Sequence, residues 1–155
     1  MIKELNIIDR NAPSERRPDW LRVKLPSGEK FKEVADTIRT HKLNTVCSEA
    51  RCPNMGECWG AGTATFMILG DVCTRSCSFC AVKTGRPMQG LDWDEPRRVA
   101  DAAAKMKLKH VVLTSVNRDE RKDGGAPIFA ECHRVLRETI DGVTVESLIP
   151  DFRGD

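Results

Sequence analysis

Three cysteines stand close together in the middle of the chain with the spacing Cys-x3-Cys-x2-Cys: Cys73, Cys77 and Cys80. Thiolates are soft ligands, and several of them on one short loop suit an iron–sulfur cluster. Three thiolates would leave one corner of a multi-iron cluster open, and an open iron can bind a substrate or a cofactor. The spacing therefore predicts a multi-iron centre with one free corner on residues 73–80, called here the 73–80 loop.

A second group of three cysteines lies just upstream, with the spacing Cys-x4-Cys-x5-Cys: Cys47, Cys52 and Cys58. Residues 47–58, called here the 47–58 segment, also contain the turn formers Pro53-Asn54 and Gly56, which predict a loop. The two groups use six of the seven cysteines of the chain. The sequence thus offers two separate sites with three thiolates each.

Disulfide bonds and structural zinc are the alternative uses of these cysteines. Disulfides persist in oxidising compartments, and residues 1–6 contain no apolar segment typical of a signal peptide. Structural zinc is usually enclosed by four ligands, whereas each group here has three cysteines and no histidine. The nearest histidine, His41, is six residues before Cys47 and is predicted to lie on a helix surface. Zinc is the stronger of these two alternatives.

The 73–80 loop, with Phe79 directly before its last cysteine, resembles the signature of the radical S-adenosylmethionine (SAM) enzymes. In those enzymes SAM binds the open iron of a [4Fe–4S] cluster and is cleaved reductively to give a carbon radical. From Trp20 to Asp155 the chain also resembles the N-terminal half of the lipoyl synthases, and the 47–58 cysteines are the most discriminating feature. The matching segments are 20–26, 43–47, 50–54, 62–70, 73–75, 79–87, 111–116, 123–126 and 150–155.

The resemblance implies radical insertion of two sulfur atoms at carbons 6 and 8 of a protein-bound octanoyl chain. It implies SAM and two [4Fe–4S] clusters, one that binds SAM and an auxiliary one that donates sulfur. No side chain beyond the cluster ligands is expected to be catalytic, because no acid or base can remove hydrogen from an unactivated C–H bond. The implied metal ligands are Cys73, Cys77 and Cys80 for the first cluster, and Cys47, Cys52 and Cys58 for the second.

The implied partners are octanoylated lipoyl carrier domains, on the acyltransferase subunit of 2-oxoacid dehydrogenases and the H protein of glycine cleavage. A reductant such as flavodoxin or ferredoxin is also implied. Three other interpretations stay open: another radical SAM enzyme with an auxiliary cluster, a non-enzymatic metal-binding module, and a shortened relative that binds clusters without turnover.

The composition is that of an ordinary globular domain. The 155 residues are 40% hydrophobic and 31% charged, and the net charge is +2. Such a balanced charge gives no general attraction for nucleic acid. No apolar run reaches the ~18 residues that a membrane span needs. We therefore expect a reduced cytoplasmic protein with neither a nucleic-acid nor a membrane partner.

Apolar patterning predicts the order of the elements. Residues 1–30 are polar and interrupted by prolines, which favours a wrapping extension, and about 30–42 has the spacing of an amphipathic helix. Apolar runs predict buried strands, and helical spacing predicts two further helices, the first capped by Asp94. The predicted strands are 65–69, 111–116 and 143–149, and the predicted helices run from 95 to about 106 and from 127 to 139.

This β-α-β-α-β order predicts an α/β fold with parallel strands and right-handed crossovers. We expect residues 63–155 to form a partial radical SAM (β/α) barrel of about three strands, with the 73–80 loop at the carboxyl end of the first. Residues 1–62 would form an extension with a helix and the auxiliary-cluster segment. The resemblance places the remaining strands, and a serine that completes the auxiliary cluster, beyond Asp155. Both outer strands, 65–69 and 143–149, are then expected to have unpaired edges.

Some further residues near the strand ends carry weaker signals. The segment 123–125, Asp-Gly-Gly, resembles the glycine pair that approaches SAM in radical SAM barrels, but loop glycines that permit a tight turn are an equal alternative. Residues 117–120 could contact SAM or substrate at the same end. Cys132 lies on an apolar helix stripe and is predicted to be a buried structural thiol, and His110 and His133 to be structural or exposed. The chain departs from the family at Ser48, Asn117, Glu120 and residues 121–122.

Overall fold

The computed structural model describes residue 18 and residues 27–154, so most of the predicted N-terminal extension lies outside the described part. All the predicted helices and strands are present, to within about two residues at each end. The elements follow in the order α1 (Glu29–Thr40), β1 (Asn44–Thr45), α2 (Val46–Glu49), α3 (Met55–Gly60), β2 (Thr65–Ile68), β3 (Val72–Cys73), β4 (Lys83–Thr84), α4 (Glu95–Lys105), β5 (His110–Ser115), α5 (Ala126–Thr139), β6 (Thr144–Leu148) and the 3-10 turn η2 (Phe152–Gly154).

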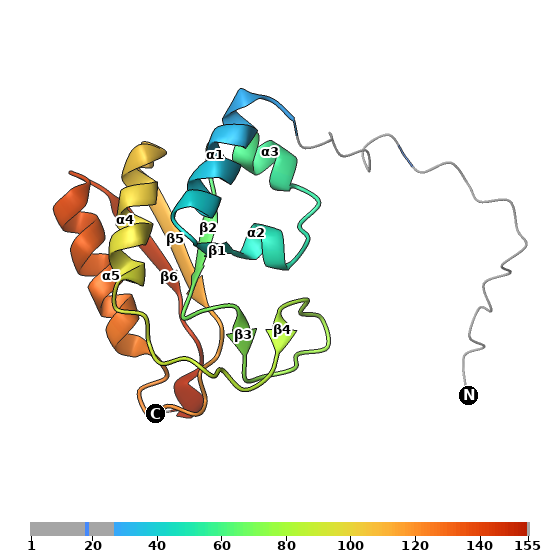
Figure 1. Cartoon of the computed structure of the whole chain (residues 1–155), viewed down its shortest axis with the longest axis vertical. Coiled ribbons are helices and arrows are strands. Elements are labelled where there is room, and N and C mark those ends of the chain that lie inside the picture. The colour runs from blue at the N-terminus through green and yellow to red at the C-terminus, as the bar shows by residue number, and fades with distance from the viewer. Residues whose placement is uncertain (1–17, 19–26, 155) are drawn as a thin grey trace, which may run out of the picture.

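The main sheet has four strands in the order β1-β2-β5-β6. Strands β2, β5 and β6 are parallel, with Thr65 opposite Val112 and His110 opposite Thr144. The connecting helices α4 and α5 lie together on one face of the sheet (Figure 1). The predicted α/β class and the parallel β-α-β-α-β order are therefore confirmed, whereas closure of these strands into part of a barrel stays a prediction.

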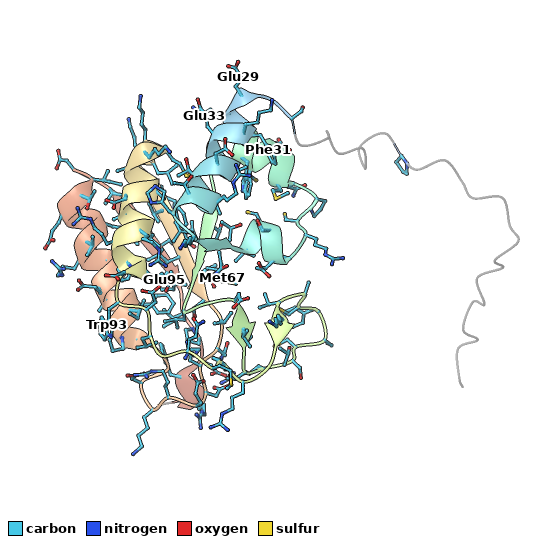
Figure 2. The ribbon with its side chains drawn as sticks, viewed as in Figure 1. Glu29, Phe31, Glu33, Met67, Trp93 and Glu95 are labelled. Carbon is cyan, nitrogen blue, oxygen red and sulfur yellow. The ribbon has the colours of Figure 1, made fainter. Side chains whose placement is uncertain are left out.

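The hydrophobic core lies between this sheet and the two helices. Its centre consists of fully buried apolar side chains, each worth about 1.5–3 kcal/mol of transfer free energy: Phe66, Ile68, Val99, Val111, Leu113, Ile128 and Leu136. A smaller contact anchors α1 to α3, where the rings of Phe31 and Trp59 stack with their centroids 5.2 Å apart. Figure 2 shows Phe31 pointing from α1 toward α3.

The outer strands do not both have free edges. Strand β1 pairs antiparallel with β2, with Asn44 opposite Met67 and Thr45 opposite Phe66. The expectation of an unpaired edge on the first predicted strand was therefore wrong, because β1 covers it; a strand of two residues is too short to give an apolar pattern. At the other side β6 is the last strand of the described sheet, and Leu148 and Ile149 beside that edge are 53% and 61% exposed.

The chain leaves β2 through one tightly held residue, Leu69. Its backbone is left-handed, with φ 71°. Its N–H donates to Glu95 Oε2 at 2.9 Å, and its carbonyl accepts from Arg118 Nη1 at 3.0 Å. Within the described residues, Glu95 and Arg118 are the two buried charged side chains, and Figure 2 shows Glu95 at the start of α4. A buried charge must be hydrogen-bonded, and here both charges fix the point from which the 73–80 loop departs.

The side chain of Leu69 fits against Gly125, the residue that precedes α5. Gly125 has φ 86°, and a Cβ added there would lie 2.5 Å from Leu69 Cδ1. We expect Gly125→Ala to lower the free energy of unfolding by about 2–4 kcal/mol, from left-handed strain plus overpacking. The measurement is urea denaturation followed by circular dichroism.

Gly142→Ala is the matched control for this substitution. Gly142 is also left-handed, with φ 66°, but an added Cβ there meets nothing within 4 Å. Its loss should stay near 1 kcal/mol, the backbone strain alone. Equal losses in the two variants would show that contact with Leu69 has no steric role.

Candidate metal centre

A small second sheet closes the base of the 73–80 loop. Strand β3 pairs in parallel with β4, with Cys73 opposite Thr84, and Gly85 N–H donates to the Cys73 carbonyl at 2.9 Å. Inside the loop Cys80 N–H donates to the Cys77 carbonyl at 3.0 Å, which makes a turn. Cys77 and Cys80 are exposed and Cys73 is half-buried. The loop thus presents its thiols at the carboxyl end of β2, as predicted, but the two short strands were missed.

The sulfur of Cys73 is the most tightly surrounded of the three. It accepts hydrogen bonds from two backbone amides, Arg75 N at 3.5 Å and Asn117 N at 3.3 Å. The first donor belongs to the same loop and the second to the segment that follows β5. The two N–H groups thus hold this sulfur in place between its own loop and the segment after β5.

The 47–58 segment is more ordered than the predicted loop. Cys47 lies on α2, Cys58 lies on α3, and Cys52 lies in the turn between them, where its N–H donates to the Cys47 carbonyl at 3.0 Å. The hydroxyl of Thr45 caps α2 by accepting from Ser48 N–H at 3.2 Å. In the view of Figure 1, α2 and α3 lie on the opposite side of the sheet from α4 and α5. The loop prediction was wrong here because two helices of four and six residues are too short to show an apolar period.

The thiol of Cys58 is affected by burial and by the two other thiols of this segment. All three are half-buried. Burial raises the pKa of the Cys58 thiol, and the neighbouring Cys47 and Cys52 raise it further. Thiolates that repel each other in a partly dry site favour a bound cation, which would compensate their charge and displace their protons.

No group of three or more His, Cys, Asp or Glu side chains in residues 27–154 is arranged to enclose one metal ion. A four-iron cluster does not need side chains that converge on one ion, because each cysteine binds a separate iron. Three cysteines on one loop, and three on a helix–turn–helix segment, fit that wider requirement in ligand type and number. The residues present therefore suit iron–sulfur clusters.

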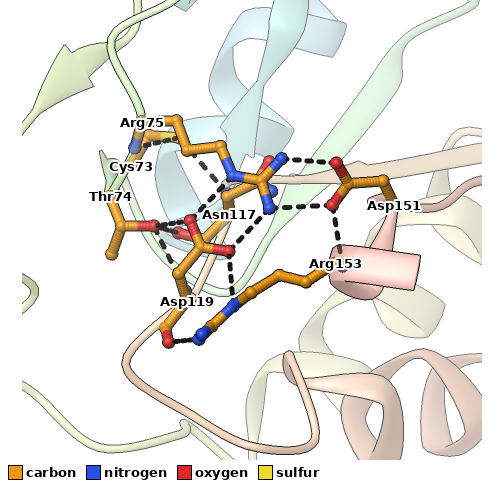
Figure 3. A network of polar contacts seen from close by, with 7 residues as sticks. All are labelled: Cys73, Thr74, Arg75, Asn117, Asp119, Asp151 and Arg153. Atoms are coloured by element: carbon orange, nitrogen blue, oxygen red, sulfur yellow. Dashed lines mark hydrogen bonds and ion pairs between the residues drawn. The ribbon is translucent and has the colours of Figure 1, made fainter. Parts of the chain in front are cut away.

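A polar network ties the 73–80 loop to the segments after β5 and β6 (Figure 3). Arg75 pairs with the carboxylates of Asp119 and Asp151, and Arg153 lies against both acids. Hydrogen bonds from Arg75 are the main reason that the pKa of each carboxyl is lowered to about 2. No local pattern in the sequence predicts this network, because its hydrogen-bonded partners lie up to 76 positions apart.

Residues 117–120, which follow β5, do not all serve the same role. Arg118 is buried and serves the fold, donating also to the Gln89 carbonyl at 2.9 Å, whereas Asn117 and Asp119 face the 73–80 loop. A Cβ on Gly124 would lie 2.6 Å from Phe152, so the glycine pair has a packing reason beside any ligand role. A cavity of about 310 Å³ opens here, lined by Asn117, Arg118, Asp119, Arg121, Lys122, Gly124, Pro150, Phe152 and Arg153.

The remaining predicted structural residues make contacts within the fold. Cys132 is fully buried on α5, and burial raises the pKa of its thiol to about 12, which confirms a structural role. His110 and His133 contact hydroxyls of β6, at Thr144 and Ser147, as expected of structural histidines. His41 follows the last residue of α1 and its carbonyl accepts from Arg98.

In the described part of the chain no helix is both long and apolar enough to cross a membrane.

Comparisons with known proteins agree with this arrangement. Residues 3–52 match the family model of the N-terminal domain of lipoyl synthase of the radical SAM family, and residues 67–154 match that of the radical SAM superfamily. The chain is 54% identical over 153 residues to a mitochondrial lipoyl synthase of Nematostella vectensis, covering 97% of this chain and 52% of the relative. It is 60% identical over 139 residues to a lipoyl synthase of Rubrobacter xylanophilus, covering 90% and 43%.

A lipoyl synthase of Flavobacterium johnsoniae is 56% identical over 138 residues, with coverage of 89% and 48%. The chain spans about half the length of the curated relatives it matches. The superfamily match begins within β2 and includes the 73–80 loop and the parallel strands β5 and β6. The chain therefore belongs to the radical SAM superfamily, and its relatives over nearly its whole length are lipoyl synthases.

Proposed function

We propose that this chain is the cluster-binding part of a lipoyl synthase, which inserts two sulfur atoms at carbons 6 and 8 of a protein-bound octanoyl chain. The observation that carries the proposal is the pair of three-cysteine groups, each on its own structural unit, in a radical SAM chain related to lipoyl synthases. Two units allow two clusters with different tasks, which a chain with only the 73–80 loop could not hold.

Cys73, Cys77 and Cys80 would bind three irons of a [4Fe–4S] cluster and leave the fourth iron to SAM. Bound together, cluster and SAM supply a carbon radical that can remove hydrogen from an unactivated C–H bond. The chain's own contribution is positional. The β3–β4 sheet fixes both ends of the loop, and Leu69 fixes its point of departure from β2, so the exposed thiols stay accessible at the strand ends.

Cys47, Cys52 and Cys58 would bind the auxiliary [4Fe–4S] cluster, which supplies sulfur. Their half-buried positions differ from the exposed Cys77 and Cys80. A partly enclosed cluster is protected from solvent, as befits a sulfur source that must survive until the substrate arrives. The stacked rings of Phe31 and Trp59 keep this segment attached to α1.

The remaining features of the proposal follow from the relatives. The substrates would be octanoylated carrier domains of 2-oxoacid dehydrogenases and of the glycine cleavage H protein, with flavodoxin or ferredoxin as the reductant. Residues 1–62 would be the extension that holds the auxiliary cluster, and residues 63–155 part of the barrel. Exposed free thiols suit a reducing compartment such as the cytoplasm.

Metal content is the first test. After anaerobic reconstitution with iron and sulfide, the chain should hold two [4Fe–4S] clusters, seen as about eight irons and a thiolate-to-iron absorption band. Replacing Cys73, Cys77 and Cys80 by Ala should remove half of the iron. Replacing Cys47, Cys52 and Cys58 should remove the other half, because each group serves a separate cluster.

Cys132→Ala is the control for these triple variants. Its thiol is buried in the core and protonated, so its loss should leave the iron count unchanged. Stoichiometric zinc without acid-labile sulfide, in place of iron, would identify a zinc module and contradict the proposal.

The division of labour is the second test. In the complete protein, loss of the 47–58 cysteines should preserve the cleavage of SAM to 5′-deoxyadenosine and abolish sulfur insertion into an octanoylated carrier. Loss of the 73–80 cysteines should abolish both. Mass spectrometry of the carrier and chromatography of the nucleoside measure the two activities. Lipoyl product from the 47–58 variant would show that sulfur comes from another source.

A further inference from the structure

In the network of Figure 3 one side chain, that of Arg75, joins its own loop to two other segments of the fold. It donates from Nε and Nη2 to the Asp119 carboxylate, at 2.8 and 2.7 Å. It also donates from Nη1 and Nη2 to the Asp151 carboxylate, at 2.7 Å each. Two-pronged pairs between arginine and carboxylate have a fixed geometry. Arg75 therefore fixes the segments after β5 and β6 relative to its own loop.

The charges of this network are balanced. Arg153 Nε lies 3.5 Å from Asp119 Oδ1, and Arg153 N–H donates to Asp151 Oδ1 at 3.1 Å. Two guanidinium groups thus face two carboxylates. A group with balanced charges exerts little net field on a neighbouring cluster. The intact network would therefore influence the Cys73 site by fixing the positions of its neighbours and not by its charge.

A geometric connection from Arg75 to the Cys73 sulfur is present. Asp119 lies two residues after Asn117, whose N–H donates to Cys73 Sγ at 3.3 Å. Thr74 reinforces the connection: its N–H donates to the Asn117 carbonyl at 3.1 Å, and its single hydroxyl proton is shared between Asp119 Oδ2 at 2.8 Å and that carbonyl at 3.1 Å. The Asn117 amide cannot move away from the sulfur while these contacts hold.

We infer that Arg75 is a positioning residue: by holding Asp119 and Asp151, it keeps the Asn117 amide on the sulfur of Cys73. The consequence for reduction rests on the proposed function, since it requires that Cys73 binds iron. Hydrogen bonds to a ligating sulfur favour the reduced cluster, which carries more negative charge. Loss of the network should therefore make the reduction potential of that cluster more negative while all three thiolate ligands remain.

A purely electrostatic role would give a different pattern. Loss of the positive charge of Arg75 would lower the potential, and loss of the negative charge of Asp119 would raise it. Positioning predicts a lower potential in both cases, because either change releases the Asn117 amide. Arg75→Lys separates the two explanations further, because lysine keeps the charge but cannot form the two-pronged pairs.

The experiment compares Arg75→Lys and Asp119→Ala with the control Arg134→Ala. Arg134 also pairs with two carboxylates, Glu131 and Glu138, but on the exposed surface of α5. In the metal-free chain, hydrogen exchange at the Asn117 amide should become about two- to tenfold faster in both test variants, as expected for one lost hydrogen bond. The control should exchange as the unchanged chain does.

The reconstituted proteins supply the second readout. A mediated redox titration followed by electron paramagnetic resonance should give more negative potentials for Arg75→Lys and Asp119→Ala, and an unchanged value for the control. Unchanged exchange at Asn117, or potentials that move in opposite directions, would overturn the inference. A chain that binds no iron on the 73–80 loop would overturn the proposed function instead, while exchange at Asn117 would still decide whether Arg75 positions that amide.

Discussion

The geometry of the cysteine-bearing end of the sheet depends on how one residue, Leu69, is held at the end of β2. Leu69 adopts a left-handed backbone that β-strand residues do not favour, and two buried charges of opposite sign bind its N–H and its carbonyl. Burial raises the pKa of Glu95, so the N–H of Leu69 also helps to keep that carboxylate ionised. Because Glu95 begins α4 and Arg118 follows β5, one residue connects the strand, the helix and the next loop.

The two cysteine groups are positioned by different physical means. The 73–80 loop is irregular between its ends and gains its order from backbone pairing at its base and from ion pairs with distant segments. The 47–58 segment gains its order from two short helices and from aromatic stacking against α1. The 73–80 loop is thus held largely by polar contacts and exposes two of its three thiols, whereas the 47–58 segment is held largely by packing and covers all three in part.

The long elements and the cysteine groups could be read from the sequence because their signals are local. An apolar run such as 65–69 is complete within five residues, and the spacing of Cys73, Cys77 and Cys80 is complete within eight. Strands β1, β3 and β4 could not be predicted, since two residues have no measurable period. The Arg75 network could not be predicted either, because its partners come together only after β5 and β6 have paired in register. The buried pair Glu95 and Arg118 could not be predicted from the sequence, because charged side chains are usually exposed.

The parallel pairing of β3 with β4 has a consequence for how folding and metal binding are related. Residues 74–82 form a loop of nine residues whose ends are already joined by this pairing. Backbone pairing between β3 and β4 therefore offsets the length-dependent entropy of closing such a loop, which is about 2 kcal/mol. In zinc fingers, by contrast, the metal itself drives the chain to fold. Here hydrogen bonds and ion pairs of the chain itself hold the two ends of the loop and Arg75 within it, so the cluster of the proposed function would have to order only the residues between β3 and β4.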